Sequence, residues 1–501
     1  MPALKRLAST YPFLAVFLAF QLFRFCLLPF MGLMPQDAYY FFYGENLALS
    51  YFDHPGMIAY ILHVFTSVFG DHVFVIKLAD FCVTSLTLYV FYKLAQCFLP
   101  RGKQFTALAL FGSTILISIV SIISTPDVPL LLFWSLSLLA LYRAIFEGKK
   151  GWWPVAGFFM GFAFDSKYSA LLLQIGLLIF LALSDTYRRL LLSRELWTAL
   201  LISVLVTFPV FYWNYTHHFA SFLFQSATRS ESITRFAFNY KSFLGTIGHQ
   251  AFILLPVLFI SLLVLTFRFA KKALRNRALP DGKNLFLLCF FAPAFVGFFL
   301  ISLVYWVKIN WMMPAYITGS LLAAAYLSQK QIRVNLIFSG VIHVALAVEI
   351  LFYPVQIKSD DTWFGWRKLA TSVDAIADSY PNTFIFSDDN YKTTAELNFF
   401  LDEKVYAQNI VGKNALQYDF VGDDLNKLRG MNAVFVDSDP RFRNMNRRGT
   451  YPPELKTFFT SVKELNPIII RNGNKAVRKF WVYYCTGYRP PLTGIAQKAQ
   501  N

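Results

Sequence analysis

Residues 125–150 read TPDVPLLLFWSLSLLALYRAIFEGKK, and this stretch decides the fold class. From Pro129 to Phe146 it contains no acid and a single base, Arg143, close to its end. About 20 mostly apolar residues are enough for a helix to cross a membrane. An acid, Asp127, precedes the apolar run, and two lysines follow it. The stretch therefore predicts a membrane-spanning helix with a basic inner end and an acid at its outer end.

The same pattern recurs along the chain of 501 residues. Hydrophobic residues make up 56% of the sequence and charged residues 15%, whereas soluble domains carry about 25% charged residues. This composition excludes a disordered chain, a coiled coil and an ordinary soluble enzyme. The five cysteines are scattered and predict neither a disulfide framework nor a zinc site. About eleven apolar segments qualify as spans, at residues 13–30, 73–98, 105–123, 129–146, 152–164, 168–183, 196–212, 247–267, 285–304, 311–327 and 334–353.

Charge predicts the orientation. If the N-terminus lies inside, about +15 of the formal net charge of +17 falls on the inner side, as the positive-inside rule requires. An odd number of spans then places the tail, residues 354–501, outside. We predict a transmembrane domain at residues 1–353 with catalytic outer loops and an extracytoplasmic mixed α/β domain at residues 354–501. In the tail, strands are expected at residues 383–386, 433–436, 467–470 and 480–484, and helices at 366–378 and 393–401.

Polar clusters in the loops fall on the outer side of this topology. Charged side chains at membrane depth are costly and usually have a partner or a function. Simpler explanations remain open. Asp127 could cap a helix, and His54 could stabilise a tight turn. Arg229 could contact anionic lipid, and Lys167 and Lys308 could extend from the ends of spans to the interface. Paired His217 and His218 lack the spacing of a metal site, so no metal is predicted. The candidate side chains are Asp37, Tyr40, Asp53, His54, Asp127, Lys167, Tyr168, Asn214, Arg229 and Lys308.

These motifs, in this order, resemble the bacterial family 39-type glycosyltransferases, relatives of protein O-mannosyltransferases and of the lipid A aminoarabinose transferase. The resemblance rests on QDAYY at residues 36–40, YFDHPG at 51–56, TPD at 125–127, SKY at 166–168, WN at 213–214 and NW at 310–311. In the tail, GWRKL at residues 365–369 and NYK at 390–392 also match. The chain departs from the family pattern at the first acidic position, which is Gln36, and Asp37 is the only acid left in that motif.

The resemblance implies a C-type glycosyltransferase fold and a sugar donor carried on a polyprenyl phosphate, with undecaprenyl phosphate in the outer leaflet as the expected carrier. It also implies an inverting transfer that needs no nucleotide, metal or other cofactor. We predict that Lys167, Lys308 and Arg229 contact the leaving phosphate, with Tyr168 as a further donor. Asp37 and Asp127 are expected to orient or deprotonate the acceptor, whereas Asp53 and His54 shape the loop.

The expected acceptor is lipid A or another envelope glycolipid, because the tail resembles a compact domain of that bacterial group, and a protein hydroxyl is the alternative. The sequence shows no phosphate-cradling glycine loop, which disfavours nucleotide chemistry, and we expect membrane lipids but no nucleic acid as partners. A transporter of lipid-linked glycans is the alternative from another class, but it would be expected to show internal repeats and midplane polar residues. A purely structural membrane subunit does not explain the outer clusters. The predicted location is the inner membrane of a bacterium, with the N-terminus cytoplasmic and the tail periplasmic.

Overall fold

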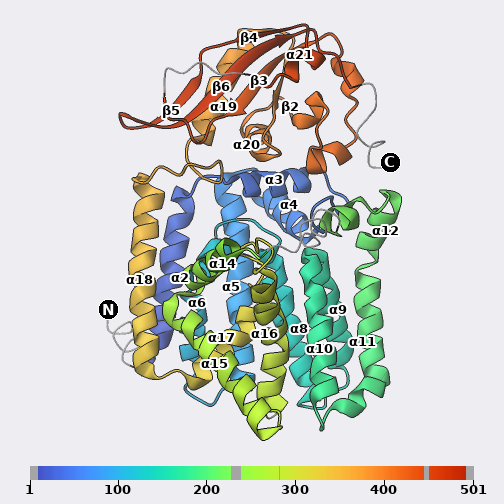
Figure 1. Ribbon diagram of the computed structural model, residues 1–501, viewed down its shortest axis with the longest axis vertical. Coiled ribbons are helices and arrows are strands. Elements are labelled where there is room, and N and C mark those ends of the chain that lie inside the picture. The colour runs from blue at the N-terminus through green and yellow to red at the C-terminus, as the bar shows by residue number, and fades with distance from the viewer. Residues whose placement is uncertain (1–9, 227–237, 281, 445–450, 492–501) are drawn as a thin grey trace.

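The computed structural model describes residues 10–226, 238–280, 282–444 and 451–491. A bundle of helices fills the lower part of the molecule in Figure 1, and a twisted sheet with its own helices lies above it. Two short helices, α3 (Pro35–Glu45) and α4 (Met57–Phe69), lie between these two parts. α3 contains the first polar motif of the outer loop and α4 follows the second, so the structure places that loop at the boundary between bundle and sheet.

The bundle is built from apolar helices. Five described helices are long and apolar enough to cross a membrane, or seven if each of two bent pairs counts as one span. This supports a multi-pass membrane protein, while the count of eleven spans stays a prediction. Apart from α3 and α4, the described α-helices of the bundle are α2 (Pro12–Leu27), α5 (Val73–Phe98), α6 (Gln104–Gly112), α7 (Ile115–Val120), α8 (Asp127–Ile145), α9 (Trp152–Ser166), α10 (Leu171–Leu183), α11 (Arg194–Val206), α12 (Phe208–Thr216), α14 (Tyr240–Leu254), α15 (Pro256–Asn276), α16 (Gly282–Ile301), α17 (Ala315–Tyr326) and α18 (Gln329–Phe352).

Three apolar segments that the sequence suggests as single spans are broken. The segment at 196–212 is divided between α11 and α12, whose axes differ by 44°. The segment at 247–267 is divided between α14 and α15, whose axes differ by 117°. Leu255 has a φ of 70° at the break, and Pro256 has no N–H with which to continue the helix of α14. The segment at 105–123 is divided after Gly112, and Thr114 caps the new helix by accepting a hydrogen bond from the amide of Ile117.

The tail forms the predicted mixed α/β structure. Its sheet has the order β2-β1-β3-β6-β4, with β5 also pairing with β6. β1 is parallel to β2 and β3, whereas β6 runs antiparallel to its neighbours. The expected strands and helices are confirmed. They are α19 (Trp366–Asp378), β1 (Thr383–Ser387), α20 (Lys392–Phe400), β3 (Asn432–Ser438), β5 (Ile468–Asn472) and β6 (Lys475–Thr486). The structure adds three short elements that the sequence did not predict: β2 (Val405–Tyr406), α21 (Leu455–Phe458) and β4 (Ser461–Glu464).

The sheet has a hydrophobic core on each face, but part of the tail belongs to the core of the bundle. Ala395 of α20 and Ala407, Ala415 and Tyr418 beyond it join the large cluster formed by the helices. In Figure 1, α20 lies directly above α3. Apolar contact therefore ties the tail to the first outer loop. The division into domains at residues 353 and 354 stays a prediction.

Candidate active site

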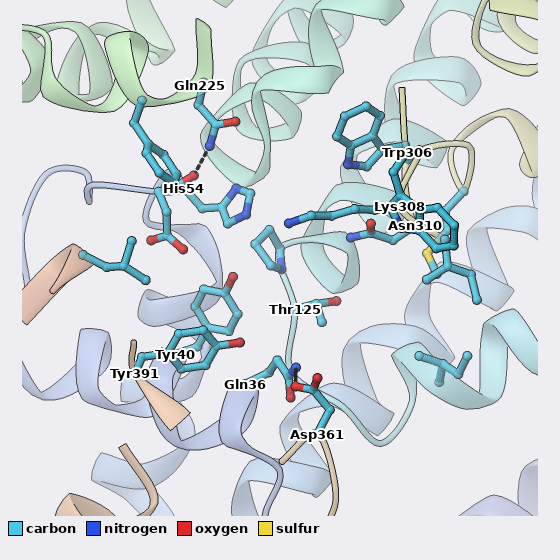
Figure 2. A pocket seen from close by; sticks show the side chains of 18 of the residues that line it. Gln36, Tyr40, His54, Thr125, Gln225, Trp306, Lys308, Asn310, Asp361 and Tyr391 are labelled. Carbon is cyan, nitrogen blue, oxygen red and sulfur yellow. Dashed lines mark hydrogen bonds between the residues drawn. The ribbon is translucent and has the colours of Figure 1, made fainter. Parts of the chain in front are cut away.

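A cavity of about 680 Å³ lies between the bundle and the tail. Figure 2 shows how side chains from distant parts of the sequence converge on it. The lining residues come from residues 36–54, from residues 119–126 before α8, from Phe224 and Gln225 beyond α12, from residues 249–313, and from the tail. The predicted residues Tyr40, Asp53, His54 and Lys308 all line this cavity. The structure thus brings together four of the side chains that the sequence singled out.

Asp53 carries the carboxyl group that the first outer loop presents to the cavity. Its Oδ1 accepts a short hydrogen bond from the hydroxyl of Tyr43 and a longer one, 3.5 Å, from Tyr39. The side-chain amide of Gln225 donates a hydrogen bond to the backbone carbonyl of Asp53. Burial raises the pKa of the Asp53 carboxyl to about 7, and the positive charge of Lys308 opposes part of this rise. A carboxyl group with this pKa can exchange a proton near neutral pH.

Lys308 comes from the loop between α16 and α17. Its side chain reaches across the cavity, and the ammonium group points toward His54 (Figure 2). Asn310 follows on the same loop and also lines the cavity. A cation and an amide on one wall form a suitable surface for an anionic oxygen.

Asp127 and Lys167 lie together behind this wall. Lys167 Nζ contacts both carboxylate oxygens of Asp127, at 2.8 and 2.9 Å, and both side chains are nearly fully buried. Asn310 Nδ2 donates to Asp127 Oδ2 at 2.6 Å. The predicted pair is therefore in contact, although neither residue lines the cavity. Asn310, which does line it, connects the pair to the cavity. A cap on α8 does not account for these contacts, because Asp127 is held by side chains from two other segments.

Asp37 lies at the third position of α3 and is fully buried. Three donors contact its carboxylate: the amides of Met34 and Ser124, at 2.8 and 2.7 Å, and the ammonium group of Lys77. Lys77 is also fully buried and donates to the carbonyl of Ile122 at 2.7 Å. Asp37 therefore joins α3, α5 and the turn before α8, but it is not among the residues that line the cavity.

Tyr168 and Asn214 form a separate cluster near α12. The Tyr168 hydroxyl lies 2.6 Å from Ser221 Oγ. Asn214 donates to the carbonyl of Val210 at 3.0 Å and accepts from the amide of Phe222 at 3.2 Å, so its amide group is used in local structure. Neither residue lines the cavity. Arg229 falls outside the described residues.

The tail supplies part of the wall, in line with the expectation from the sequence that it covers the outer mouth of the bundle. Asp361, Tyr391 and Leu416 line the cavity. Gln36 donates to Asp361 at 2.9 Å, and Tyr391 stacks on Tyr39 with ring centroids 4.4 Å apart. The resemblance at residues 390–392 was the one signal in the sequence that pointed to this part of the tail.

Lys77 was missed for a different reason. It lies within an apolar run, and its partner Asp37 is 40 residues away. Such a lysine is identified only once its acid partner is known to be close. Within the described ranges, no group of three or more histidine, cysteine or acidic side chains is placed to hold a metal ion. That no metal or cofactor is needed stays a prediction.

Known proteins resemble the chain in sequence. Residues 53–213 match the model of a family described as dolichyl-phosphate-mannose-protein mannosyltransferase. The lipid A galacturonosyltransferase RgtD of Rhizobium johnstonii is 24% identical over 428 residues, which cover 81% of this chain and 86% of the relative. The family resemblance and the prediction of a glycosyltransferase are thereby confirmed.

Solved structures resemble it in fold. The crystal structure of ArnT from Cupriavidus metallidurans bound to undecaprenyl phosphate matches with a TM-score of 0.58 at 15% identity, covering 95% of this chain and 98% of ArnT. The arabinofuranosyltransferase AftD from Mycobacteria matches with a TM-score of 0.52 at 11% identity, covering 96% of this chain and 40% of AftD. At these identities the likeness is one of fold, and it confirms the C-type glycosyltransferase architecture.

Proposed function

We propose that this chain is an inverting glycosyltransferase of the membrane that moves a sugar from a polyprenyl phosphate to lipid A or another envelope glycolipid. The observation that carries the proposal is the cavity between bundle and tail, where Lys308 and Asp53 share one polar space. A lipid-linked donor and a lipid acceptor can both reach such a place from the membrane.

The donor's phosphate is assigned to Lys308, with Asn310 and His54 beside it. When the bond between the anomeric carbon and the phosphate oxygen breaks, the phosphate leaves with the electron pair and its negative charge increases. A fixed ammonium group stabilises that developing charge more than the ground state, which lowers the barrier. Lys167 does not contact the phosphate in this proposal; it holds Asp127, which in turn holds Asn310.

The polyprenyl chain is assigned to the side of α14. Trp306 lines the cavity and is 51% exposed, and it packs edge-on against His249 of α14. Along the same helix Leu244 and Phe252 are exposed. Apolar side chains exposed beside the cavity mouth suit a hydrocarbon chain that lies in the membrane. Undecaprenyl phosphate is the proposed carrier, supported by the ArnT structure that holds it.

Asp53 is the proposed proton acceptor when the acceptor group is a hydroxyl. The hydroxyl oxygen forms a bond with the anomeric carbon from the face opposite the phosphate, and its proton passes to the Asp53 carboxylate. A phosphate monoester on lipid A needs no base, because its second pKa is about 6 and it is already a nucleophile at neutral pH. Asp37 and Asp127 are proposed as positioning residues, which fix the first outer loop and Asn310.

The choice of lipid A is supported by RgtD, which is named for that acceptor. The family model matched by residues 53–213 is named for protein acceptors, and this favours a protein hydroxyl as the second candidate. We propose an inner-membrane location with the cavity and tail on the periplasmic side, for which the distribution of charge is the support.

Mass spectrometry of lipid A and of glycoproteins, from cells with and without this chain, tests the proposal. The expected result is a sugar mass on lipid A that disappears with the chain and returns with the parent gene. Lys308→Ala should fail to restore it, whereas Lys463→Ala, which removes an exposed lysine from β4, should restore it fully. A sugar lost from glycoproteins alone would favour the second candidate, and normal transfer by Lys308→Ala would contradict the phosphate assignment.

A further inference from the structure

A second cavity, of about 370 Å³, lies where two candidate spans end below the tail. Its wall is formed by residues 28–33 after α2, by the start of α5, by residues 363–368 of the tail and by Phe400. It shares no lining residue with the first cavity. We call it the boundary groove.

The boundary groove is apolar with a basic edge. Phe30 and Phe74 line it and are 61% and 39% exposed, so apolar surface is open where the spans reach the interface. Arg367 and Lys368, both exposed, are the only charged side chains among its lining residues. The guanidinium of Arg367 lies 4.8 Å from the ring centre of Phe400, and the ammonium of Lys368 lies 5.8 Å from that of Phe364.

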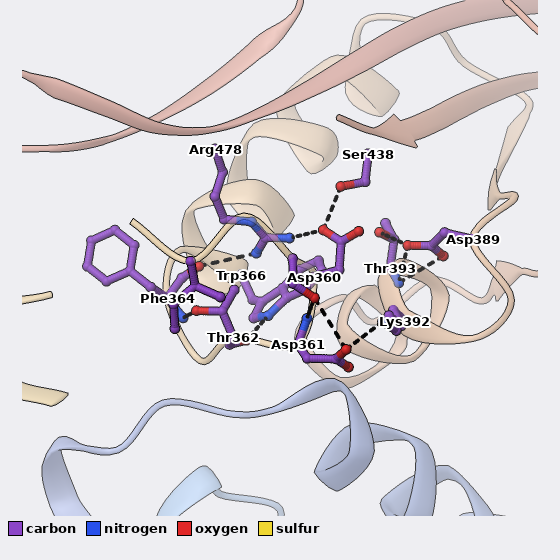
Figure 3. Close-up of polar contacts among 12 residues, drawn as sticks. Asp360, Asp361, Thr362, Phe364, Trp366, Asp389, Lys392, Thr393, Ser438 and Arg478 are labelled. Carbon is purple, nitrogen blue, oxygen red and sulfur yellow. Dashed lines mark hydrogen bonds and ion pairs between the residues drawn. The ribbon is translucent and has the colours of Figure 1, made fainter. Parts of the chain in front are cut away.

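The tail segment that forms this edge is held in place from behind (Figure 3). Arg478 forms a buried ion pair with Asp360 at 2.7 Å and donates to the carbonyl of Phe364 at 3.2 Å. The indole of Trp366 donates to the carbonyl of Thr362 at 2.7 Å. The groove is therefore a built feature of the fold.

The two bases at the edge differ from Arg478 in one respect. The charge of Arg478 is neutralised by Asp360, whereas Arg367 and Lys368 form no ion pair with an acid in the described ranges. The indole N–H of Trp363, which also lines the groove, has no acceptor among the described residues. Two cations thus stand above an apolar surface at the membrane boundary.

We propose that the boundary groove binds an anionic phospholipid, with an acyl chain against Phe30 and Phe74 and the phosphate against Arg367 and Lys368. Juxtamembrane lysine and arginine attract anionic headgroups, and tryptophan favours the headgroup layer. A glycolipid suits the groove less well, because sugar hydroxyls need paired donors and acceptors that this edge does not offer. The site lies outside the transfer reaction and does not depend on it.

Site-specific photo-crosslinking tests this proposal. The full chain carrying Phe30→p-benzoylphenylalanine is placed in equimolar vesicles of phosphatidylglycerol and phosphatidylcholine, and the crosslinked lipids are identified by mass spectrometry. We expect phosphatidylglycerol to exceed phosphatidylcholine by at least about fivefold, because two unneutralised bases face the headgroup. The double variant Arg367→Gln/Lys368→Gln should bring this ratio close to one.

The matched control is Arg268→Gln/Lys271→Gln, which removes two bases from α15 outside the groove and should leave the ratio unchanged. Lys368→Glu, a second variant at an exposed position, should lower the ratio as well. A ratio near one in the parent protein would overturn the proposal. So would preferential crosslinking of lipid A when it is added to the vesicles, since the groove would then serve the acceptor.

Discussion

At the scale of single residues, the position of Asp53 has the clearest consequence for the reaction. Burial places its pKa at about 7, so the carboxyl group is largely protonated at pH 6 and largely ionised at pH 8. A base accepts a proton only in its ionised form. We therefore expect kcat/KM for a hydroxyl acceptor to rise with pH, with a midpoint at about 7. Asp53→Asn should abolish this rise, the ascending limb of the pH profile, and lower kcat/KM by about 100-fold or more.

Lys308 provides an internal check on that profile. Its positive charge holds the pKa of Asp53 below the value that burial alone would give. Lys308→Ala should move the limb to higher pH in addition to slowing transfer, while Lys308→Arg keeps the charge and the midpoint. A phosphate acceptor also titrates near pH 6, but that limb would survive in Asp53→Asn. An unchanged midpoint near 7 in Asp53→Asn would contradict the role assigned to this carboxyl group.

The buried pair of Asp37 and Lys77 predicts an interdependence of two substitutions. Loss of one partner leaves an uncompensated charge in an apolar setting, which costs about 3–5 kcal/mol. Asp37→Asn and Lys77→Met should each lower the melting temperature in detergent, and the double variant should recover most of the loss. Comparing the melting temperatures of the four proteins shows whether the effects of the two substitutions are coupled.

Activity measurements then separate stability from positioning. The double variant still lacks the carboxylate that holds the amide of Ser124, and with it the turn that leads to Asp127. We expect sugar transfer to stay more than tenfold below the parent although stability has returned. A double variant that transfers within tenfold of the parent would show that Asp37 matters only as the partner of Lys77. Asp80→Asn is unsuitable as a control, since it also contacts Ser124.

The residues show where sequence reasoning succeeds and where it stops. Motifs at span ends on one side of the membrane were expected to meet, and Asp127, Lys167 and Asn310 do. Whether each side chain faces the cavity or bonds to neighbouring protein groups could not be predicted, because this depends on packing at the scale of single ångströms. Asn214 looked like a binding residue but its amide group is bonded to neighbouring backbone.

At the scale of elements, α20 and the segment before it close the cavity from the tail side. Tyr391 stacks on Tyr39 of α3 and lines the cavity, and Gln417 accepts a hydrogen bond from the amide of Phe52 at 2.8 Å. These contacts connect the tail directly with the first outer loop. The tail is therefore expected to affect how an acceptor is held, beyond covering the bundle.

Removing one ring tests this role. A stacked aromatic pair contributes about 0.5–1.5 kcal/mol beyond its buried area, which corresponds to roughly 2- to 13-fold in an equilibrium constant. Tyr391→Ala should raise the KM for the acceptor by about this factor, whereas Tyr391→Phe keeps the ring and should stay within about twofold of the parent. Tyr380→Ala is the matched control, because Tyr380 stacks on Tyr484 at 4.3 Å away from the cavity. Equal effects of the two alanine variants would indicate a general loss of stability in the tail.

The elements also mark a limit of prediction. Apolar runs located the helices, and alternation located the strands of the tail, because both signals are local. The bend between α14 and α15 follows from Leu255 and Pro256, yet Pro256 in the sequence is equally compatible with a kinked span. Whether such a proline bends a helix slightly or turns it by 117° depends on the surrounding structure. Here Asn335 of α18 accepts a hydrogen bond from the amide of Leu258.

At the scale of the whole molecule, the asymmetry of charge and the position of the cavity lead to one common orientation. The long basic helix α15 ends far from the tail in Figure 1, and the cavity lies beside the tail. If the basic ends lie in the cytoplasm, the cavity and the tail must both lie outside. Substrate exposed in the outer leaflet then reaches the cavity without crossing the membrane.

Cysteine labelling decides this orientation. In a background with the five native cysteines replaced by alanine, Ala375→Cys places a thiol on the exposed side of α19, and Asn276→Cys places one at the exposed end of α15. A membrane-impermeant maleimide should label Ala375→Cys in intact spheroplasts and Asn276→Cys only after permeabilisation, because about +15 of net charge holds the α15 side inside. Both thiols should react in detergent, which controls for access. Labelling in the reverse order would place the cavity in the cytoplasm, where an outer-leaflet donor could not reach Lys308.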